Sequence, residues 1–366
     1  MTAEPDAIDL TSVVNLHDFE PIARARMAGP AFDYVAGGSW DEITLEERIT
    51  TWRRYRFVPR VLRDVRTIDV AGNFLGRAAA IPIAIAPMAV QALAHPGGEA
   101  EMAAAAAAAG IPFCMSTSSS QAMEDVATAA PGSERWFQLY VVGGMDYSRR
   151  LVERAEAAGY RAIVVTVDLP VLGFRERDHR SGFALPAMPH MDPAGDTHPS
   201  RYGAVEGQRG AGLTWDSLAE IRSWSSLPVV VKGILSPPDA RLAVEAGVDG
   251  IVVSTHGGRQ LDRSITTADA LAGIVEAVGR RCEVWVDGGI RRGLDVIVAL
   301  ALGATGVLVG RPFYWALASG GRAGVERAVD ILRSELEIAL PLLGCASMAE
   351  VGRDLLRAPA EGVAGT

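Results

Sequence analysis

The sequence predicts an α/β fold, a single (β/α)8 TIM barrel with an N-terminal helical extension and a long loop after the fourth strand. Three observations lead to this prediction. Brief apolar runs rich in Val and Ile recur eight times after residue 80, helix-like segments separate them, and the chain of 366 residues suits one large barrel. Two ordinary domains, or an open doubly wound sheet, are the alternatives that length and alternation leave open.

The eight apolar runs lack polar alternation, which is typical of parallel strands that are covered on both faces. Between them, SPPDARLAVEAG shows the expected helix signals, with Ser236 as N-cap, Pro237 at the first helical position and Gly247 as the stop. Eight strand–helix repeats favour closure into a barrel. The runs are IPIAIAPM from Ile81, PFCMST from Pro112, WFQLYV from Trp136, AIVVTVD from Ala162, PVVVKG from Pro228, GIVVST from Gly250, EVWVDGG from Glu283 and GVLVGR from Gly306.

The flanking segments define the expected organisation of one domain over residues 1–366. Residues 1–75, which include FDYVAGGSWDEITLEERI, are expected to form a helical extension before a barrel of residues 76–345. Residues 346–366 form a C-terminal tail. The connection between Asp168 and Pro228 is long and rich in Pro, Gly, His and Met, which is typical of a lid or a binding loop.

Composition excludes several functional classes. The net charge of −9 argues against nonspecific binding to nucleic acid or to an anionic membrane, although a local cationic pocket remains compatible with it. The three cysteines form no CxxC pair, so we expect a reduced cytoplasmic protein without a disulfide framework, and we expect no metal site. The acidic N-terminus lacks an apolar signal segment, and Gly and Pro interrupt the uncharged stretches that resemble membrane spans.

Polar side chains stand at the carboxyl end of nearly every predicted strand. In a barrel these ends meet at one mouth, where active sites are built. A single polar strand end is usually a cap or a turn former, but so many together predict a binding site for a polar ligand. These residues are Ser116, Gln138 with Tyr140, Thr166 with Asp168, Lys232, Ser254 with His256, Asp287, and Gly310 with Arg311.

Two glycine-containing motifs follow the seventh and eighth predicted strands, DGGIRRG (Asp287 to Gly293) and VGR (Val309 to Arg311). Glycines let backbone N–H groups approach an anion, and a helix N-terminus adds its dipole. Arg291 and Arg311 are suited to charge-assisted bonds with phosphate. The motifs therefore indicate a phosphate site, with ordinary barrel turns as the alternative. No GxGxxG follows the first strand, which argues against a Rossmann dinucleotide site.

The motif VSTHGGRQLD (Val253 to Asp262) follows the sixth predicted strand. His256 is a candidate general base because imidazole titrates near neutral pH. Asp168, after the fourth strand, is a plausible partner that orients it. Arg259 is suited to bind a carboxylate bidentately. A structural histidine is the alternative interpretation.

These motifs together resemble the FMN-dependent α-hydroxy acid oxidase and dehydrogenase family, which includes glycolate and lactate oxidases and mandelate dehydrogenase. The resemblance extends over nearly the whole chain. It rests on FDYVAGG (Phe32 to Gly38), PRVLRDV (Pro59 to Val65), IAPMA (Ile85 to Ala89), AHPGGE (Ala94 to Glu99), FQLYV (Phe137 to Val141), TVD (Thr166 to Asp168), VVKG (Val230 to Gly233), HGGRQLD, DGGIRRG and VGRP, in this order.

The resemblance implies FMN as cofactor and oxidation of an L-2-hydroxy acid to the 2-oxo acid, with two electrons passing to flavin N5. His256 would accept a proton with Asp168 behind it, and Tyr140 would bind the α-oxygen. Tyr34, Arg175 and Arg259 would bind the substrate carboxylate. The flavin would be held by Pro87, Met88, Ala89, Ser116, Gln138, Thr166, Lys232 and Ser254, and its ribityl chain and phosphate by Asp287, Gly288, Gly289, Arg291, Gly310 and Arg311.

Four positions depart from the family pattern. Met88 and Thr255 replace the usual Thr and Asn, and Val35 replaces a second Tyr of some members. Ser118 stands where members similar to glycolate oxidase carry a bulky aromatic residue, so we expect Ser118 to leave room for a mandelate-like or medium-chain substrate.

The sequence leaves several features open. The substrate can lose a hydride directly or form a carbanion first, and the reduced flavin can pass electrons to O2 or to another acceptor, as in an oxidase, a monooxygenase or a dehydrogenase. The family resemblance suggests a homotetramer or octamer. An FMN-dependent isomerase of the isopentenyl-diphosphate type and a noncatalytic phosphate-binding barrel are the alternative functions.

Overall fold

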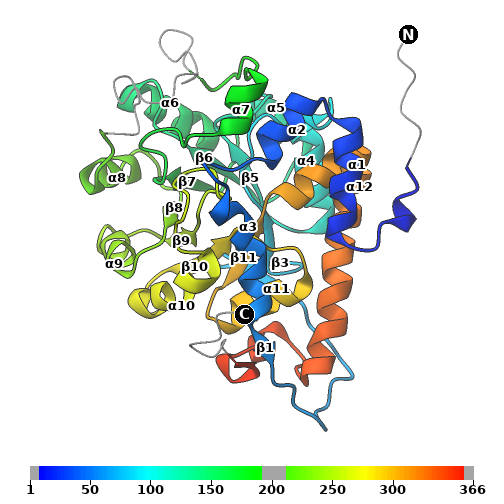
Figure 1. The fold of residues 1–366 in the computed structure, drawn as a ribbon. Helices are drawn as coiled ribbons and strands as arrows, with labels where there is room; N and C mark the ends of the chain where they lie inside the picture. The colour runs from blue at the N-terminus through cyan, green and yellow to red at the C-terminus, as the bar shows by residue number, and fades with distance from the viewer. Residues whose placement is uncertain (1–7, 192–211, 358–366) are drawn as a thin grey trace.

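The computed structural model describes residues 8–191 and 212–357, and it shows a closed barrel of eight parallel strands (Figure 1). The strands follow one another around the barrel in chain order, and the last pairs with the first, Val307 opposite Ile83. This closure confirms the predicted barrel over the open sheet. The strands are β4 (Ile83–Ile85), β5 (Phe113–Ser116), β6 (Arg135–Leu139), β7 (Ala162–Thr166), β8 (Val229–Ile234), β9 (Gly250–Val253), β10 (Glu283–Asp287) and β11 (Gly306–Val309).

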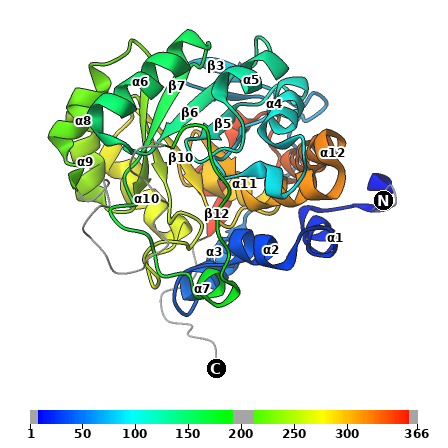
Figure 2. The same cartoon turned by 90° about the horizontal axis from the view of Figure 1, so that it is seen from above.

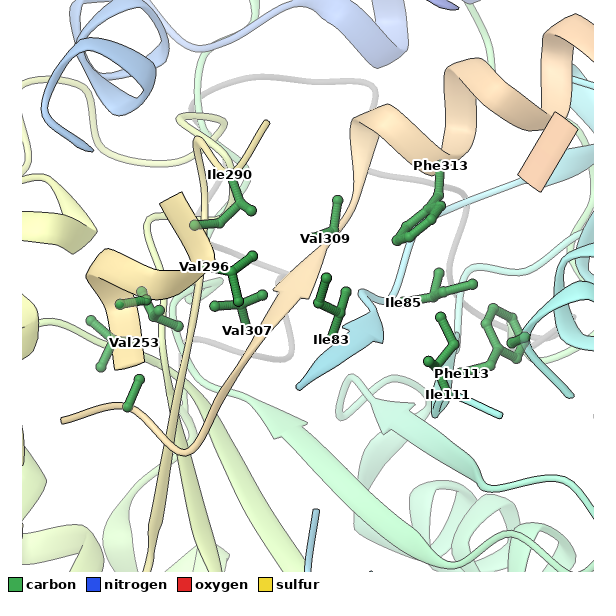
Figure 3. Packing of buried hydrophobic residues seen from close by; sticks show 14 of the residues in the cluster. Ile83, Ile85, Ile111, Phe113, Val253, Ile290, Val296, Val307, Val309 and Phe313 are labelled. Atoms are coloured by element: carbon green, nitrogen blue, oxygen red, sulfur yellow. The ribbon is translucent and has the colours of Figure 1, made fainter. Parts of the chain in front are cut away.

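The strands are buried on both faces, as their continuous apolar runs predicted. Successive side chains of a strand point to opposite faces, so Ala84 faces the barrel interior while Ile83 and Ile85 pack outward. Figure 3 shows Ile83 and Ile85 beside Val309 of β11 and Phe313 of the following helix. This packing fixes the register of each strand and therefore the residues that reach the barrel mouth.

Helices surround the barrel on its outside (Figure 2). Ser236 accepts a hydrogen bond from the Asp239 amide and caps α9, as predicted, and Gly247 with φ +76° follows the helix end. The longest helix contains non-helical backbone at Gly320 and Gly321, which divides it into two segments. The surrounding helices are α4 (Gly98–Ala109), α5 (Met123–Ala129), α6 (Gly144–Ala157), α8 (Trp215–Arg222), α9 (Pro237–Glu245), α10 (Thr267–Val278), α11 (Gly293–Ala301) and α12 (Arg311–Leu343).

An aromatic cluster fills the end of the barrel where the strands begin. The hairpin of β2 (Gly72–Phe74) and β3 (Arg77–Ala79) brings Phe74 against Trp136 and Trp285. The two tryptophan rings lie 5.5 Å apart between centroids, and Phe74 lies 5.8 Å from Trp136. Gly250 makes room for this cluster, because a Cβ there would lie 2.1 Å from the Trp285 ring. Aromatic side chains thus close this end of the barrel.

The N-terminal extension is helical up to residue 50 and then continues as short irregular elements. Its helices are α1 (Phe19–Arg26), α2 (Gly29–Ala36) and α3 (Ile43–Thr50), and β1 (Arg56–Phe57) pairs antiparallel with β12 (Leu356–Arg357) of the C-terminal tail. The long connection after β7 contains α7 (Glu176–Ser181), which lies beside α2 in both views (Figures 1 and 2). The rest of the predicted loop at 192–211, and the termini at 1–7 and 358–366, lie outside the described residues.

Two properties of the described residues bear on function. None of their helices combines the length and the apolar character that a membrane crossing requires. Within the same residues, no three His, Cys, Asp or Glu side chains are grouped so that they could hold a metal ion.

Candidate active site

A chain of buried polar side chains crosses three neighbouring strands at the barrel mouth. Ser116 ends β5 and donates to Gln138 of β6 at 3.0 Å, and the Gln138 amide donates to Thr166 at the end of β7, also at 3.0 Å. All three side chains are buried. Neighbouring parallel strands place equivalent residues side by side, which is why residues so distant in sequence form one network.

On the other side of the mouth, Lys232 of β8 joins two further predicted residues. Its Nζ donates to Ser254 Oγ at 3.0 Å and lies 3.3 Å from Asp287 Oδ2 at the end of β10. Burial alone would lower the pKa of Lys232, but the nearby Asp287 and Asp168 carboxylates raise it above its ordinary value. Lys232 therefore carries a fixed positive charge inside the mouth. Asp287 Oδ1 is buried and has no hydrogen-bond partner among the described residues.

His256 lies between Asp168 and Tyr140. Its Nδ1 is 2.7 Å from Asp168 Oδ1, and its Nε2 is 3.2 Å from the Tyr140 hydroxyl. The two rings are nearly parallel, with an interplanar angle of 18°. The structure thus brings together three residues from the ends of β6, β7 and β9, as the sequence predicted.

The backbone of His256 is in the left-handed region, with φ +55°. Few residues other than glycine adopt this conformation, and it is concentrated at functional sites. Ser254 Oγ accepts a hydrogen bond from the His256 amide at 3.0 Å and stabilises the turn. The turn thus belongs to the local structure that holds the imidazole between Asp168 and Tyr140.

The protonation states of the pair follow from burial and charge. Burial lowers the pKa of His256, partly opposed by the Asp168 carboxylate. For Asp168, burial acts to raise the pKa, but the His256 charge and hydrogen bond, with Lys232, more than offset it and lower the pKa. Both lowered pKa values agree with a neutral imidazole that donates from Nδ1 to the ionised Asp168 carboxylate. Its Nε2 is then free to accept a proton, and the Tyr140 hydroxyl, whose pKa burial raises, remains protonated.

This arrangement predicts the pH dependence of the reaction. If His256 is the base, kcat/KM for flavin reduction should rise with pH as His256 loses its proton, and then reach a plateau. Because burial lowers the His256 pKa, the midpoint should lie below about 6.5, the ordinary value for histidine. Anaerobic stopped-flow measurement across pH tests this. A midpoint above that value would contradict the assignment.

A second group of predicted residues lies beside the imidazole. The Arg259 guanidinium lies 4.9 Å from the centroid of the Tyr34 ring and donates to the carbonyls of Tyr34 and Gly37, the latter at 3.0 Å. Arg175, the N-cap residue of α7, donates from Nε to the Arg259 carbonyl at 3.3 Å. Burial, and then the Arg259 charge, lower the pKa of Arg175 to about 10. Two guanidinium groups and a phenol are thus gathered on one side of the mouth.

The glycines after β10 allow the N-terminal extension to approach the barrel closely. Gly288 and Gly289 have φ values of +88° and +85°, and a Cβ on Gly289 would lie 1.8 Å from the Arg48 carbonyl oxygen. Arg291 is buried in the same loop, where Asp295 Oδ2 accepts a hydrogen bond from its backbone amide at 2.8 Å. Only glycine fits at position 289 without displacing α3.

Gly310 and Arg311 begin α12 at the end of β11, as predicted. The Arg311 side chain, however, does not extend freely into the mouth. It donates to the carbonyls of Val35, Gly37 and Gly257 at 2.8, 2.9 and 2.8 Å. Arg311 therefore ties the C-terminal end of α2 to the loop after β9, while its backbone amide remains at the helix N-terminus.

Several arginines at the mouth, of which Arg48 and Arg291 are buried and Arg259 and Arg311 half-buried, lack a compensating carboxylate. Among the described residues, no carboxylate oxygen lies within 4.0 Å of the guanidinium groups of Arg48, Arg259, Arg291 and Arg311. Burial lowers the pKa of Arg291 to about 10, and burial together with the charges of neighbouring arginines lowers the pKa of Arg311 well below its ordinary value. Buried charges are normally paired, so this site favours anionic ligands. The arginines, with the unpartnered Asp287 Oδ1 as an acceptor for a hydroxyl, fit the phosphate and the ribityl chain of FMN.

The remaining predicted residues lie at the rim of the mouth. Pro87, Met88 and Ala89 follow β4 and are half-buried, with Met88 next to Gly310. Ser118 is half-buried two residues beyond β5, and its carbonyl accepts a hydrogen bond from the Val90 amide at 2.9 Å. The loops after β4 and β5 are therefore joined beside the mouth.

Sequence reasoning missed two buried residues. Arg48 of α3 gave no signal, because an arginine within a polar helix pattern is usually exposed. His190, in the long loop after β7, bonds to Ser119 Oγ at 3.0 Å and accepts a hydrogen bond from the Met123 amide at 3.1 Å. Burial lowers the pKa of His190 to about 4, so a neutral imidazole anchors this loop beside β5. Its only sequence signal was its place within a Pro- and Met-rich loop.

A profile of the FMN-dependent dehydrogenase family matches residues 23–358. The chain belongs to this family. L-lactate oxidase of Nostoc sp. is 44% identical over 360 residues, which cover 95% of this chain and 99% of that protein. 4-Hydroxymandelate oxidase of Amycolatopsis orientalis is 45% identical, with coverage of 93% and 97%. Family membership confirms the resemblance and FMN as the cofactor.

Solved structures give the same result for the fold. A crystal structure of mandelate oxidase superimposes with a TM-score of 0.85 at 45% identity, covering 94% of this chain and 98% of that one. Spinach glycolate oxidase is a further relative, 42% identical with coverage of 96% and 97%. The chain therefore groups with 2-hydroxy acid oxidases, and neither the isomerase nor the noncatalytic alternative is favoured.

Proposed function

We propose that the protein oxidises an L-2-hydroxy acid larger than glycolate to the corresponding 2-oxo acid, with His256 as the base and O2 as the acceptor of the electrons. The observation that supports this most directly is the placement of His256 between Asp168 and Tyr140, next to the arginines. The three relatives described above carry the names of oxidases of lactate, glycolate and 4-hydroxymandelate.

The polar network at the mouth is suited to hold the cofactor. Ser116, Gln138 and Thr166 offer donors and acceptors to the edge of a flavin ring, and the backbone of Pro87 to Ala89 would run along it. Lys232, with Ser254, offers positive charge where a reduced flavin is anionic. The groups suited to the ribityl chain and phosphate are Asp287, Gly288, Gly289, Arg291, Gly310 and Arg311.

When bound, FMN accepts the two electrons that leave the substrate; the chain supplies the remaining chemistry. Arg259 and Arg175 bind the substrate carboxylate, and Tyr34 packs beneath Arg259. The Tyr140 hydroxyl donates to the α-oxygen. His256 Nε2 then accepts one of the two protons that the substrate loses, and Asp168 stabilises the imidazolium that forms.

The size of the substrate side chain is proposed from Ser118. The residue is small, it lies at the rim beside Val90, and it leaves more space than an aromatic side chain would. Mandelate oxidase structures at 44–45% identity support an aromatic or medium-chain group. The test is anaerobic flavin reduction with a panel of 2-hydroxy acids, followed by admission of air. Preference for glycolate over mandelate would contradict this proposal, and slow reoxidation by air would contradict the assignment of O2.

A single substitution sharpens this test. In Ser118→Trp, the indole should fill the space proposed for the substrate side chain. A large substrate side chain would then overpack the site, which is unfavourable. We expect kcat/KM for mandelate-like acids to fall at least about tenfold while that for glycolate stays within about threefold. Ser133→Trp, far from the mouth, is the control. An equal loss for all acids would show that the substitution disturbs the site as a whole.

We also propose that the chain forms one domain over residues 1–366, acts in the cytoplasm and assembles as a homotetramer or octamer. Exposed apolar side chains such as Val61, Leu62 and Leu342 are consistent with burial between subunits. The described cysteines, Cys114, Cys282 and Cys345, form no disulfides, which is consistent with a reducing compartment. Light scattering of the purified protein measures its assembly state.

A further inference from the structure

Helix α3 packs directly on the loops that follow β9 and β10. A Cβ on Gly258 would lie 2.8 Å from the Leu45 amide nitrogen, and one on Gly289 would lie 1.8 Å from the Arg48 carbonyl oxygen. One turn further along the chain, Trp52 Nε1 donates to the Gly288 carbonyl at 2.9 Å. These contacts fix α3 against the predicted phosphate loop and place Arg48 at the centre of the contact.

The Arg48 side chain is buried there, with 8% of its surface exposed. Its guanidinium donates to the Leu45 carbonyl of its own helix, and no carboxylate oxygen of the described residues lies within ion-pair distance. Burial, and then the Arg291 charge, lower the pKa of Arg48 to about 9, although Glu20 and Glu42 partly oppose this shift. Arg48 is also the neighbouring charge that lowers the pKa of Arg311 most. Arg48 therefore shares one electrostatic environment with Arg291 and Arg311.

The buried guanidinium groups of Arg48 and Arg291 and the half-buried one of Arg311 repel one another, and an anion bound beside them would relieve this repulsion. A guanidinium offers five N–H donors, and the one hydrogen bond to Leu45 leaves most of those of Arg48 unused. Arg175 and Arg259 lie near Tyr34, on the side proposed for the substrate carboxylate. Arg48 lies instead beside the loop after β10, so the anion that it is suited to bind is the phosphate and not the substrate carboxylate.

We infer that Arg48, on the N-terminal extension, is a third arginine of the FMN phosphate site and binds the phosphate monoester together with Arg291 and the start of α12. This inference rests on the proposed placement of the phosphate at the β10 and β11 loops. It gives the extension a role in cofactor binding: the phosphate would hold α3 on the barrel, and α3 would close the phosphate site.

The test compares FMN with riboflavin, which lacks the phosphate. Apoprotein of the full chain is titrated with each flavin, for wild type and for Arg48→Met, and binding is followed by quenching of flavin fluorescence. A charge-assisted hydrogen bond to phosphate predicts about 10- to 100-fold weaker FMN binding in Arg48→Met. Riboflavin binding should change less than about twofold, and Arg48→Lys should recover part of the FMN affinity.

A matched control is Arg54→Met. It removes the same charge from a neighbouring arginine that is 48% exposed and ion-paired with Asp269 at 2.5 Å, so the affinity for FMN should not change. The melting temperature of each apoprotein separates a binding role from a structural one. Replacing a buried unpaired charge with an apolar side chain should leave the Arg48→Met apoprotein at least as stable as wild type, while the rise in melting temperature on adding FMN should shrink.

Equal loss of affinity for both flavins, a less stable apoprotein, or unchanged FMN binding would each overturn the inference about Arg48. Failure of the wild-type protein to bind FMN at all would instead overturn the proposed function. The two failures are therefore distinguishable in the same titration.

Discussion

Substitution of His256 by Asn should reduce the rate of flavin reduction by a 2-hydroxy acid by about 10²- to 10⁴-fold, the contribution typical of a general base. Asn is the matched replacement, because it tolerates the left-handed backbone that His256 adopts at φ +55°. Its amide cannot accept a proton at neutral pH. The measurement is anaerobic stopped-flow with substrate in excess, followed by the loss of the visible absorbance of the oxidised flavin.

The His256→Asn protein should still bind FMN and show the absorbance of a bound flavin. His17→Asn, in the N-terminal extension, is the control and should reduce its flavin at the wild-type rate. Reduction of the His256→Asn enzyme at the wild-type rate would exclude His256 as the base. Loss of FMN from it would instead indicate a structural role for the turn after β9.

The second large effect is expected for Asp168→Asn. Asn keeps the size of the side chain and an acceptor for His256 Nδ1, but it lacks the charge that stabilises the imidazolium. The backbone should stay in place, because the Asp168 carbonyl accepts a separate hydrogen bond from Gln260 Nε2 at 2.9 Å. We expect flavin reduction to slow by roughly 10²- to 10⁴-fold, as when the acidic member of a catalytic triad is neutralised.

The pH profile gives this variant a second signature. The Asp168 carboxylate raises the pKa of His256, so its removal should lower that pKa and move the acidic limb of kcat/KM to lower pH than in wild type. Asp125→Asn, on the exposed face of α5, serves as the control and should change neither rate nor profile. A limb that stays in place or moves to higher pH would contradict the pairing of Asp168 with His256.

The sequence predicted the barrel well because its signals are local. Each strand is a continuous apolar run, and each mouth residue is found by its position at the end of such a run. Gln138 and Thr166, for example, lie where the parallel register places them, without any knowledge of their contacts. Helix signals were equally local, as the capping of α9 by Ser236 shows.

The features that escaped prediction depend on long-range contacts. Pairing of β1 with β12 joins Arg56 to Arg357, 301 positions along the chain, and no periodicity in the sequence marks this pairing. The burial of Arg48 depends on where α3 packs, and the anchoring of the long loop by His190 depends on contacts with the loop after β5 and the start of α5. The direction of the Arg311 side chain was equally inaccessible, because the carbonyls that it binds come from three separate positions.

The aromatic cluster of Phe74, Trp136 and Trp285 has a consequence for how small molecules enter and leave the barrel. Because this cluster closes the end where the strands begin, the hydroxy acid enters and the oxo acid leaves through the same opening, at the carboxyl ends of the strands. The product must therefore be released through this opening before the next substrate molecule can enter.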